Sequence, residues 1–116
     1  MDPAGRRFHF IGAGGVGMSG LIELLLNQGA IVSGSDCLQT AVTDKLQRLG
    51  ARINIGHDPR NVDASTEVTV VSAAVRKDNP ELIAALEGNN RVCKYAQMLG
   101  ALSARYECIA VAGTHG

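Results

Sequence analysis

The stretch FHFIGAGGVGMSG, residues 8–20, constrains the fold of this 116-residue chain more than any other. A short apolar run enters a cluster of glycines and continues into a long apolar helical pattern. Gly12, Gly14 and Gly17 match the G-x-G-x-x-G spacing, in which the glycines allow a tight turn, a close approach of phosphate and close helix–strand packing, respectively. Free N–H groups at the start of the helix, together with its dipole, favour a diphosphate. The stretch therefore predicts a nucleotide-binding β-α unit, and a glycine turn without a ligand is the alternative.

Capping and turn signals divide the rest of the chain into alternating strands and helices. We expect further strands at residues 30–33, 52–55, 67–72 and 91–94, and helices at about 16–28, 42–49, 80–87 and 96–105. A short helix is expected to begin at Pro59 with Asp58 as its cap, and Asn79 is expected to cap the helix that begins at Pro80. The apolar residues expected to face inward on the last three of these helices are Val42, Leu46 and Leu49, then Leu82, Ile83 and Leu86, then Met98, Leu99 and Leu102. Such β-α-β units wind right-handed into a parallel sheet. We predict a Rossmann-like, doubly wound α/β fold of about five strands with helices on both faces.

Ligands of such folds bind beyond the carboxyl ends of the strands. The glycine-rich or polar stretches 12–17, 34–36, 56–58 and 72–74 all fall at that edge, which favours one shared site. Asp36 lies 19 positions after Gly17, where a ribose-binding carboxylate is expected, and this spacing fits NAD and UDP equally.

Three side chains near this edge have two interpretations each. His57 either bonds a phosphate or is solvated, Ser72 either donates to the ligand or ends its strand, and Asp36 either binds the ribose or is solvated. His9, inside the first strand, is expected to be structural.

The composition excludes several classes of function. Eleven basic and eleven acidic residues cancel, which argues against a nucleic-acid-binding or anionic-membrane-binding surface. The three cysteines have no C-x-x-C spacing, so they indicate neither a disulfide framework nor a zinc site. No run of 18 apolar residues and no signal peptide is present, and we expect a cytoplasmic protein.

The last residues, CIAVAGTHG at 108–116, form the pattern of a strand that enters a second glycine turn. A strand followed by G-x-x-G is how a phosphate-binding loop begins, although the usual lysine and hydroxyl are missing here. We therefore interpret the chain as a piece of a longer protein. A frayed terminus with an accidental pair of glycines is the alternative.

Four segments, in this order, carry a resemblance over nearly the whole chain: HFIGAGGVGMSG, SGSD, VVSAA with DNPE after it, and AVAGTHG. Together they resemble the amino-terminal domain of the Mur ligases. The resemblance implies that residues 1–107 are a UDP-sugar-binding domain and that residues 108–116 begin a central ATP-binding domain, inside the family's G-T-H-G-K-T-T loop.

The implied activity is that of the family members that join L-alanine to UDP-N-acetylmuramate in peptidoglycan biosynthesis. They activate the muramic acid carboxylate as an acyl phosphate with ATP and magnesium. This piece alone is expected to bind without catalysing, and to hold no metal or cofactor itself.

The resemblance also implies roles for individual residues. The diphosphate would lie on the backbone of Gly12, Ala13, Gly14, Gly15, Val16, Gly17, Met18 and Ser19; Ser35 and Asp36 would lie at the uridine; His57, Ser72, Ala73 and Ala74 would line the same cleft; and Gly113, Thr114, His115 and Gly116 match the start of the ATP loop. Gln97 stands where many relatives carry glutamate, which puts a charge-based role there in doubt, although an amide oxygen still accepts a hydrogen bond.

Three other functions stay open from the sequence. One is the related ligase that attaches a recycled tripeptide to the same UDP-sugar. Another is an NAD-binding oxidoreductase domain, which the glycine spacing and Asp36 alone would allow. The last is a nucleotide-binding domain without enzymatic activity.

Overall fold

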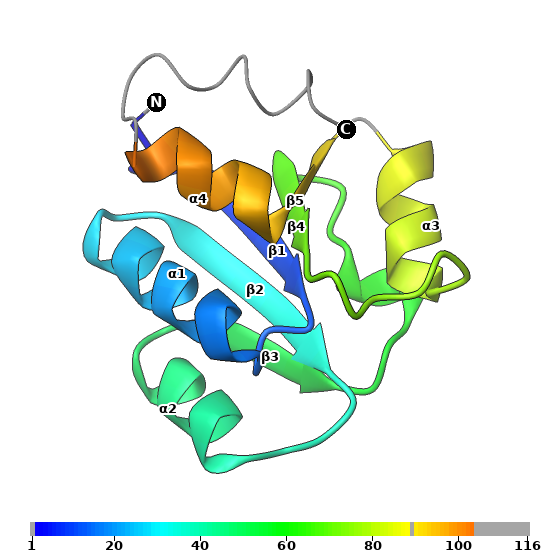
Figure 1. The fold of residues 1–116 in the computed structure, drawn as a ribbon, viewed down its shortest axis with the longest axis horizontal. Coiled ribbons are helices and arrows are strands. Elements are labelled where there is room, and N and C mark those ends of the chain that lie inside the picture. The colour runs from blue at the N-terminus through cyan, green and yellow to red at the C-terminus, as the bar shows by residue number, and fades with distance from the viewer. Residues whose placement is uncertain (1, 89, 104–116) are drawn as a thin grey trace.

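The computed structural model describes residues 2–88 and 90–103, and within them five parallel strands form one sheet (Figure 1). The strands are β1 (Arg7–Ile11), β2 (Ile31–Asp36), β3 (Arg52–Ile55), β4 (Val68–Val71) and β5 (Arg91–Lys94). The helices are α1 (Val16–Asn27), α2 (Ala41–Arg48), α3 (Pro80–Glu87) and α4 (Tyr95–Ser103), with a short 3₁₀ helix, η1 (Pro59–Asn61). The strand order is β3-β2-β1-β4-β5. This arrangement confirms the predicted Rossmann-like parallel sheet.

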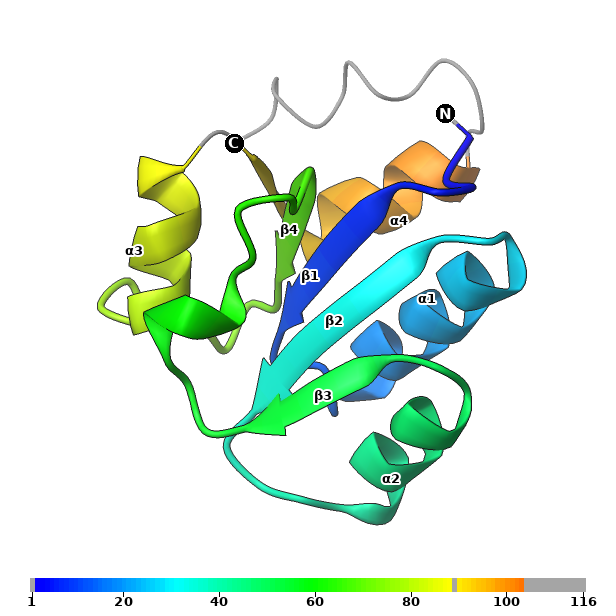
Figure 2. The same cartoon turned by 180° about the vertical axis from the view of Figure 1, so that it is seen from behind.

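Helices cover both faces of the sheet. The helices α1, α2 and α4 lie on one face, and Figure 2 shows α3 and η1 on the other. The chain runs outward from β1 to β3 and then crosses back through η1 to β4, beside β1. The break in strand order therefore falls between β1 and β4, which is where folds of this kind place their ligands.

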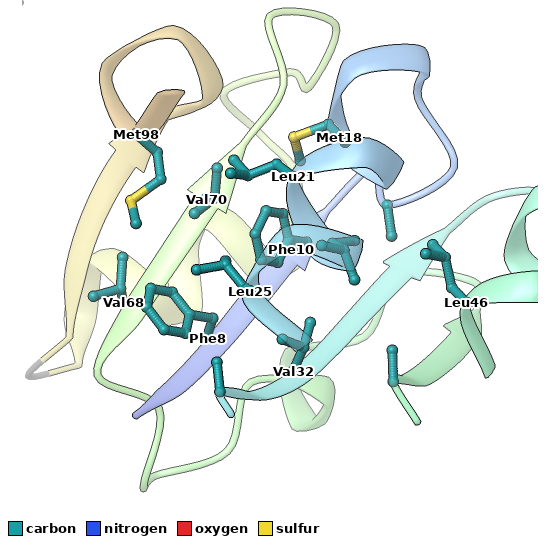
Figure 3. Close-up of a cluster of buried hydrophobic side chains, with 14 of the residues drawn as sticks. Phe8, Phe10, Met18, Leu21, Leu25, Val32, Leu46, Val68, Val70 and Met98 are labelled. Atoms are coloured by element: carbon teal, nitrogen blue, oxygen red, sulfur yellow. The ribbon is translucent and has the colours of Figure 1, made fainter. Parts of the chain in front are cut away.

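The hydrophobic core lies between the sheet and α1. Side chains alternate across a strand, and Phe8 and Phe10 of β1 point toward Leu21 and Leu25 of α1 (Figure 3). The register places Val32, Val68 and Val70 of the neighbouring strands on the same side. Burial of a side chain of this size contributes roughly 1.5–3 kcal/mol to folding.

The opposite face of the same strands carries several polar side chains beside the apolar Ile11 and Val71. His9 of β1 is in register with Ser33 of β2 and Thr69 of β4, and Ile11 is in register with Ser35. His9, Ser35 and Thr69 are completely buried. This polar face lies beneath α3, and its hydrogen bonds are described with the site below.

The predicted inward stripe of α3 is wrong at two of its three positions, since only Leu82 is half-buried. Asn79 caps the helix as expected, accepting hydrogen bonds from the N–H groups of Glu81 and Leu82. The buried residues of α3 are Glu81 and Ala85, whereas Ile83 is 42% and Leu86 is 64% exposed. The cause is that the sheet face under α3 places His9 and Ser35 where they donate hydrogen bonds to the Glu81 carboxylate, which turns Glu81 inward.

Two other helices match the predicted inward residues in part. Of the three residues predicted to face inward at α2, Leu46 is buried, while Val42 and the C-cap residue Leu49 are exposed. Thr43 takes their place because it is buried and forms a reciprocal capping box with Thr40.

In α4, Met98 is buried as expected, but Leu99 is exposed. The side chain of Leu102 lies outside what the structure describes.

The second strand is longer than predicted. Gly34, Ser35 and Asp36 were expected after its end, but they belong to β2: all three pair with β3, and Gly34 and Ser35 also pair with β1. Gly34 makes no turn there. A Cβ on Gly34 would lie 2.9 Å from the Cβ of Ala13, so the absence of a side chain at Gly34 lets the glycine turn pack against β2.

Residues 104–116, which include the predicted last strand and second glycine turn, lie outside the described residues. Within the described part, no helix has the length and apolar character needed to cross a membrane.

Candidate functional site

The turn between β1 and α1 is built on β2. Gly12 has φ +89°, a conformation that favours glycine, and this confirms the tight turn predicted there. The N–H groups of Gly12 and Ala13 both donate to the carbonyl oxygen of Ser35, at 2.9 Å each. The turn is therefore anchored to the neighbouring strand.

The bare backbone at Gly14 admits an anion, but the anion present is a carboxylate of the chain itself. The Gly14 N–H donates to Asp36 Oδ2 at 2.8 Å, and a Cβ on Gly14 would lie 2.7 Å from that oxygen. The other carboxylate oxygen accepts from the N–H of Cys37 at 2.7 Å. Asp36 thus stands at the carboxyl end of β2, as predicted, and the amide expected to meet a phosphate holds its carboxylate.

Gly17 has a different role from the one predicted. It was expected to let α1 pack closely on a strand, but it faces Tyr95, the first residue of α4. A Cβ on Gly17 would overlap the Tyr95 hydroxyl and lie 2.5 Å from its Cζ. The reason is that α4 packs beside α1 on the same face of the sheet, so the close approach is between two helices.

The start of α1 leaves backbone donors available. Gly15 is the N-cap and supplies no side-chain acceptor. Within residues 2–88 and 90–103, no hydrogen-bond acceptor is assigned to the N–H groups of Val16, Gly17 and Met18. Ser19 is the first residue of the helix whose N–H is bonded, to the carbonyl of Gly15 at 3.0 Å. Three free N–H groups at the positive end of a helix form an anion-binding arrangement.

The turn after β4 lies next to the glycine turn. A Cβ on Gly12 would be 3.0 Å from Ser72 Oγ, and the Ser72 N–H points to the carbonyl of Ile11 at 3.4 Å. Ser72 is half-buried, and Ala73 and Ala74 are exposed. The structure therefore brings this predicted stretch to the same edge as the glycines.

The Ser35 hydroxyl and the His57 ring are hydrogen-bonded to each other near the carboxyl ends of β2 and β3. Ser35 is completely buried, and its Oγ lies 3.0 Å from His57 Nδ1. His57 follows β3, and its side chain is 23% exposed. It lines a depression of about 520 Å³. The depression is lined by Asn54, Ile55, Gly56, His57, Asp58, Arg60 and Asn61.

Glu81 is the centre of this buried network, and it was not among the predicted site residues. Its Oε1 accepts from His9 Nε2 at 2.6 Å and from Ser35 Oγ at 2.8 Å. Its Oε2 accepts from Asn61 Nδ2 at 2.8 Å and from the Asp58 N–H at 3.1 Å, and lies 3.3 Å from His57 Nδ1. His9 is structural, as expected, because its Nδ1 also bonds Ser33 Oγ, at 2.8 Å.

The ionisation of Glu81 follows from these partners. Burial raises the pKa of the carboxyl group, but the hydrogen bonds from His9, Asn61 and Ser35 outweigh burial and hold the pKa at about 2. Glu81 is therefore a buried carboxylate. Its signal in the sequence was the alternation of His9 in one strand with Ser33 and Ser35 in the next, which gives the sheet a polar face that needs a polar partner.

The remaining predictions at the site concern ATP and metal. Gly113, Thr114, His115 and Gly116 lie outside the described residues, so the structure does not test them. In the part of the chain that is described, no group of three or more His, Cys, Asp and Glu side chains could hold a metal ion. Gln97 accepts a hydrogen bond, as expected, from the Lys94 N–H at 2.9 Å.

A parallel β3-β2-β1-β4-β5 sheet with a glycine turn after β1 defines a Rossmann-like α/β domain. A family model described as "Mur ligase family, catalytic domain" matches residues 7–107. The chain therefore belongs to the Mur ligase family.

Within the family, the similarity is to ligases that act on UDP-N-acetylmuramate. The chain is 51% identical over 111 residues to the UDP-N-acetylmuramate–L-alanine ligase of Burkholderia cenocepacia (strain HI2424), covering 96% of this chain and 24% of that protein. The structure of UDP-N-acetylmuramate-alanine ligase from Thermotoga maritima matches with a TM-score of 0.81 at 29% identity, over 85% of this chain and 23% of that one. The UDP-N-acetylmuramate:L-alanyl-gamma-D-glutamyl-meso-diaminopimelate ligase from Neisseria meningitides has a TM-score of 0.75 at 26% identity, over 84% and 31%. The chain thus spans about a quarter of the length of the curated relatives it matches.

Proposed function

We propose that residues 1–107 are the UDP-N-acetylmuramate-binding domain of a ligase that uses ATP to join L-alanine to this sugar nucleotide in peptidoglycan biosynthesis. Residues 108–116 would begin the domain that binds ATP and magnesium. Such a ligase would work in the cytoplasm. This piece alone would bind the nucleotide and would not catalyse.

The observation that carries the proposal is the row of free N–H groups at the start of α1, next to an amide that already holds a carboxylate. The N–H groups of Val16, Gly17 and Met18 have no acceptor in the described part of the chain, and the Gly14 N–H bonds Asp36 Oδ2. A diphosphate oxygen would displace that carboxylate from Gly14, and Asp36 would then accept from the ribose hydroxyls. Membership of the Mur ligase family supports a UDP-sugar in preference to NAD.

Isothermal titration of the chain with UDP-N-acetylmuramate, UDP and NAD tests this assignment. We expect both uridine nucleotides to bind and NAD to neither bind nor compete. Binding should be weaker than in a complete ligase, because the rest of the ligand stays exposed to water. Binding of NAD with displacement of UDP would reject the proposal.

The second candidate is the ligase that attaches a tripeptide to the same sugar nucleotide. It is favoured by the likeness to the Neisseria ligase, which covers 84% of this chain and 31% of that one. Both candidates bind the same nucleotide, so titration does not separate them. An assay of the complete protein with L-alanine and with the tripeptide as alternative acceptors does.

A further inference from the structure

The hydrogen-bond network around Glu81 determines where His57 carries its proton. Ser35 has a single hydroxyl proton, which it donates to Glu81 Oε1 at 2.8 Å. The contact of 3.0 Å between Ser35 Oγ and His57 Nδ1 then has no proton from the serine, so Nδ1 must be the donor. The neighbouring contact agrees, because His57 Nδ1 lies 3.3 Å from Glu81 Oε2, and a bare nitrogen there would face a carboxylate lone pair.

The opposite tautomer is disfavoured by every partner of Nδ1. If Ser35 turned its proton toward His57, its oxygen would face Glu81 Oε1 at 2.8 Å with no proton between them. Glu81 cannot supply that proton, since its carboxyl group is ionised and accepts from His9, Asn61 and the Asp58 N–H as well. An unmade hydrogen bond at a buried polar atom costs about 1–3 kcal/mol.

We propose that Glu81 is a positioning residue that fixes the tautomer of His57: in the neutral form of the ring the proton stays on Nδ1, and Nε2 offers a lone pair to a donor group of the nucleoside. The inference rests on the proposed function for the identity of the ligand. His57 Nε2 has no partner in the described part of the chain, and the ring lines the depression at the carboxyl end of β3. A neutral ring in this tautomer accepts from a ribose hydroxyl or from the uracil N3–H, and it gives no hydrogen bond to a diphosphate.

Glu81 also fixes the position of the ring. The same carboxylate holds the loop after β3 through the Asp58 N–H and through Asn61. The loop, the ring and its tautomer therefore depend on one buried carboxylate.

The tautomer is measured first, on the ligand-free 116-residue chain, from the imidazole ¹⁵N chemical shifts of His57. We expect Nδ1 to be protonated and Nε2 to be bare. In Glu81→Gln the amide can present either an acceptor or a donor, so a measurable fraction of the ring should move its proton to Nε2. Glu87→Gln, an exposed glutamate on the same helix, is the control and should leave the signals unchanged.

Affinity is measured next, with UDP, 2′,3′-dideoxyuridine diphosphate, N3-methyluridine diphosphate and inorganic pyrophosphate as probes. Glu81→Gln and His57→Phe should each weaken the binding of UDP about five- to tenfold, the range for one hydrogen bond, and leave the affinity for pyrophosphate unchanged. His57→Gln, which keeps an acceptor, should recover part of the loss. One of the two uridine analogues lacks the donor group that Nε2 bonds, and the affinity for that analogue should not change in His57→Phe. This comparison decides whether Nε2 bonds the ribose or the base.

The two proposals fail in different ways. If the unmodified chain binds no UDP, the proposed function is rejected, and the ¹⁵N shifts still decide the tautomer. If UDP binds and Nε2 carries the proton, or if His57→Phe weakens pyrophosphate as much as UDP, this inference is overturned and the proposed function stands. Should Glu81→Gln fail to fold, the shifts of the unmodified chain and the His57 variants decide.

Discussion

Each of the three glycines in the G-x-G-x-x-G motif is needed for a different structural reason, which only the contacts of the single residue show. Gly12 needs its positive φ, Gly14 leaves room for the Asp36 carboxylate, and Gly17 leaves room for Tyr95. The spacing predicted the turn correctly. It did not predict the partners at Gly14 and Gly17, since both come from segments distant in the sequence.

Replacing Gly14 with valine should abolish nucleotide binding and leave the fold in place. The new side chain would enter the position of Asp36 Oδ2, which lies at the end of a short side chain and can turn away, and would block the approach of a phosphate. Titration with UDP, alongside circular dichroism of the variant, measures both effects. Gly20→Ala is the matched control on α1, because nothing lies within 4 Å of a Cβ there, and it should bind UDP normally. Undiminished binding by Gly14→Val would refute the close-approach role.

Removing the carboxylate of Asp36 should change two affinities in opposite directions. In Asp36→Ala, UDP should bind more weakly by about 1.5–3 kcal/mol, the range for a hydrogen bond to a charged group. Pyrophosphate should bind more tightly, because the Gly14 N–H no longer bonds a carboxylate. NMR titrations with both ligands measure this, with Asp78→Ala, an exposed aspartate, as the control. Parallel changes of the two affinities would contradict the assignment.

The positions of strands and helices were predicted well from the sequence, but the buried faces of the helices were predicted poorly. β3 and β5 have the predicted bounds, and the caps of α3 and η1 are the predicted Asn79 and Asp58. These features are local. Which side of α3 is buried depends on the polar sheet face beneath it, and that face becomes apparent only when β1 and β2 are placed side by side in register.

The packing of α1 on α4 should be sensitive to one methyl group. Gly17→Ala would force its Cβ into Tyr95, and overpacking of this kind costs about 1–3 kcal/mol. In the absence of Tyr95 the same change should be neutral or favourable, because alanine is about 1 kcal/mol better than glycine in a helix. Urea unfolding of Gly17→Ala, Tyr95→Ala and the double variant gives the coupling. Additive effects would show that the two residues do not meet.

The network under α3 should make stability depend on pH. The pKa of Glu81 lies at about 2 in the folded chain against an ordinary 4.5. A lowered pKa means that the stabilisation is complete above about pH 4.5 and is lost as the pH falls toward 2. The total is about 3 kcal/mol, because each unit corresponds to about 1.4 kcal/mol.

Urea unfolding between pH 6 and pH 2.5 measures this loss. Glu81→Gln should be less stable than the unmodified chain at pH 6 and should lose less on acidification. Glu87→Gln, exposed on the same helix, should follow the unmodified chain. Equal slopes for all three proteins would mean that Glu81 does not carry the linkage.

For the complete domain, both the fold class and the sheet edge that carries the site were predictable. Alternating strands and helices fix a parallel sheet, and the polar stretches at the strand ends fix the edge. The glycine turn, Asp36, His57 and Ser72 do come together there. Glu81 was missed because the polar positions of β1 and β2 indicate only that a polar partner is needed, and the five donors that surround Glu81 in the structure are what identify it.

We propose above that the backbone amides at the start of α1 bind the diphosphate of a uridine nucleotide. A crystal structure of the chain with UDP bound tests it most directly. We predict diphosphate oxygens within hydrogen-bond distance of the N–H groups of Gly14, Val16, Gly17 and Met18, with the Asp36 carboxylate moved from Gly14 to the ribose. A nucleotide bound elsewhere, with Asp36 still on Gly14, would contradict the account.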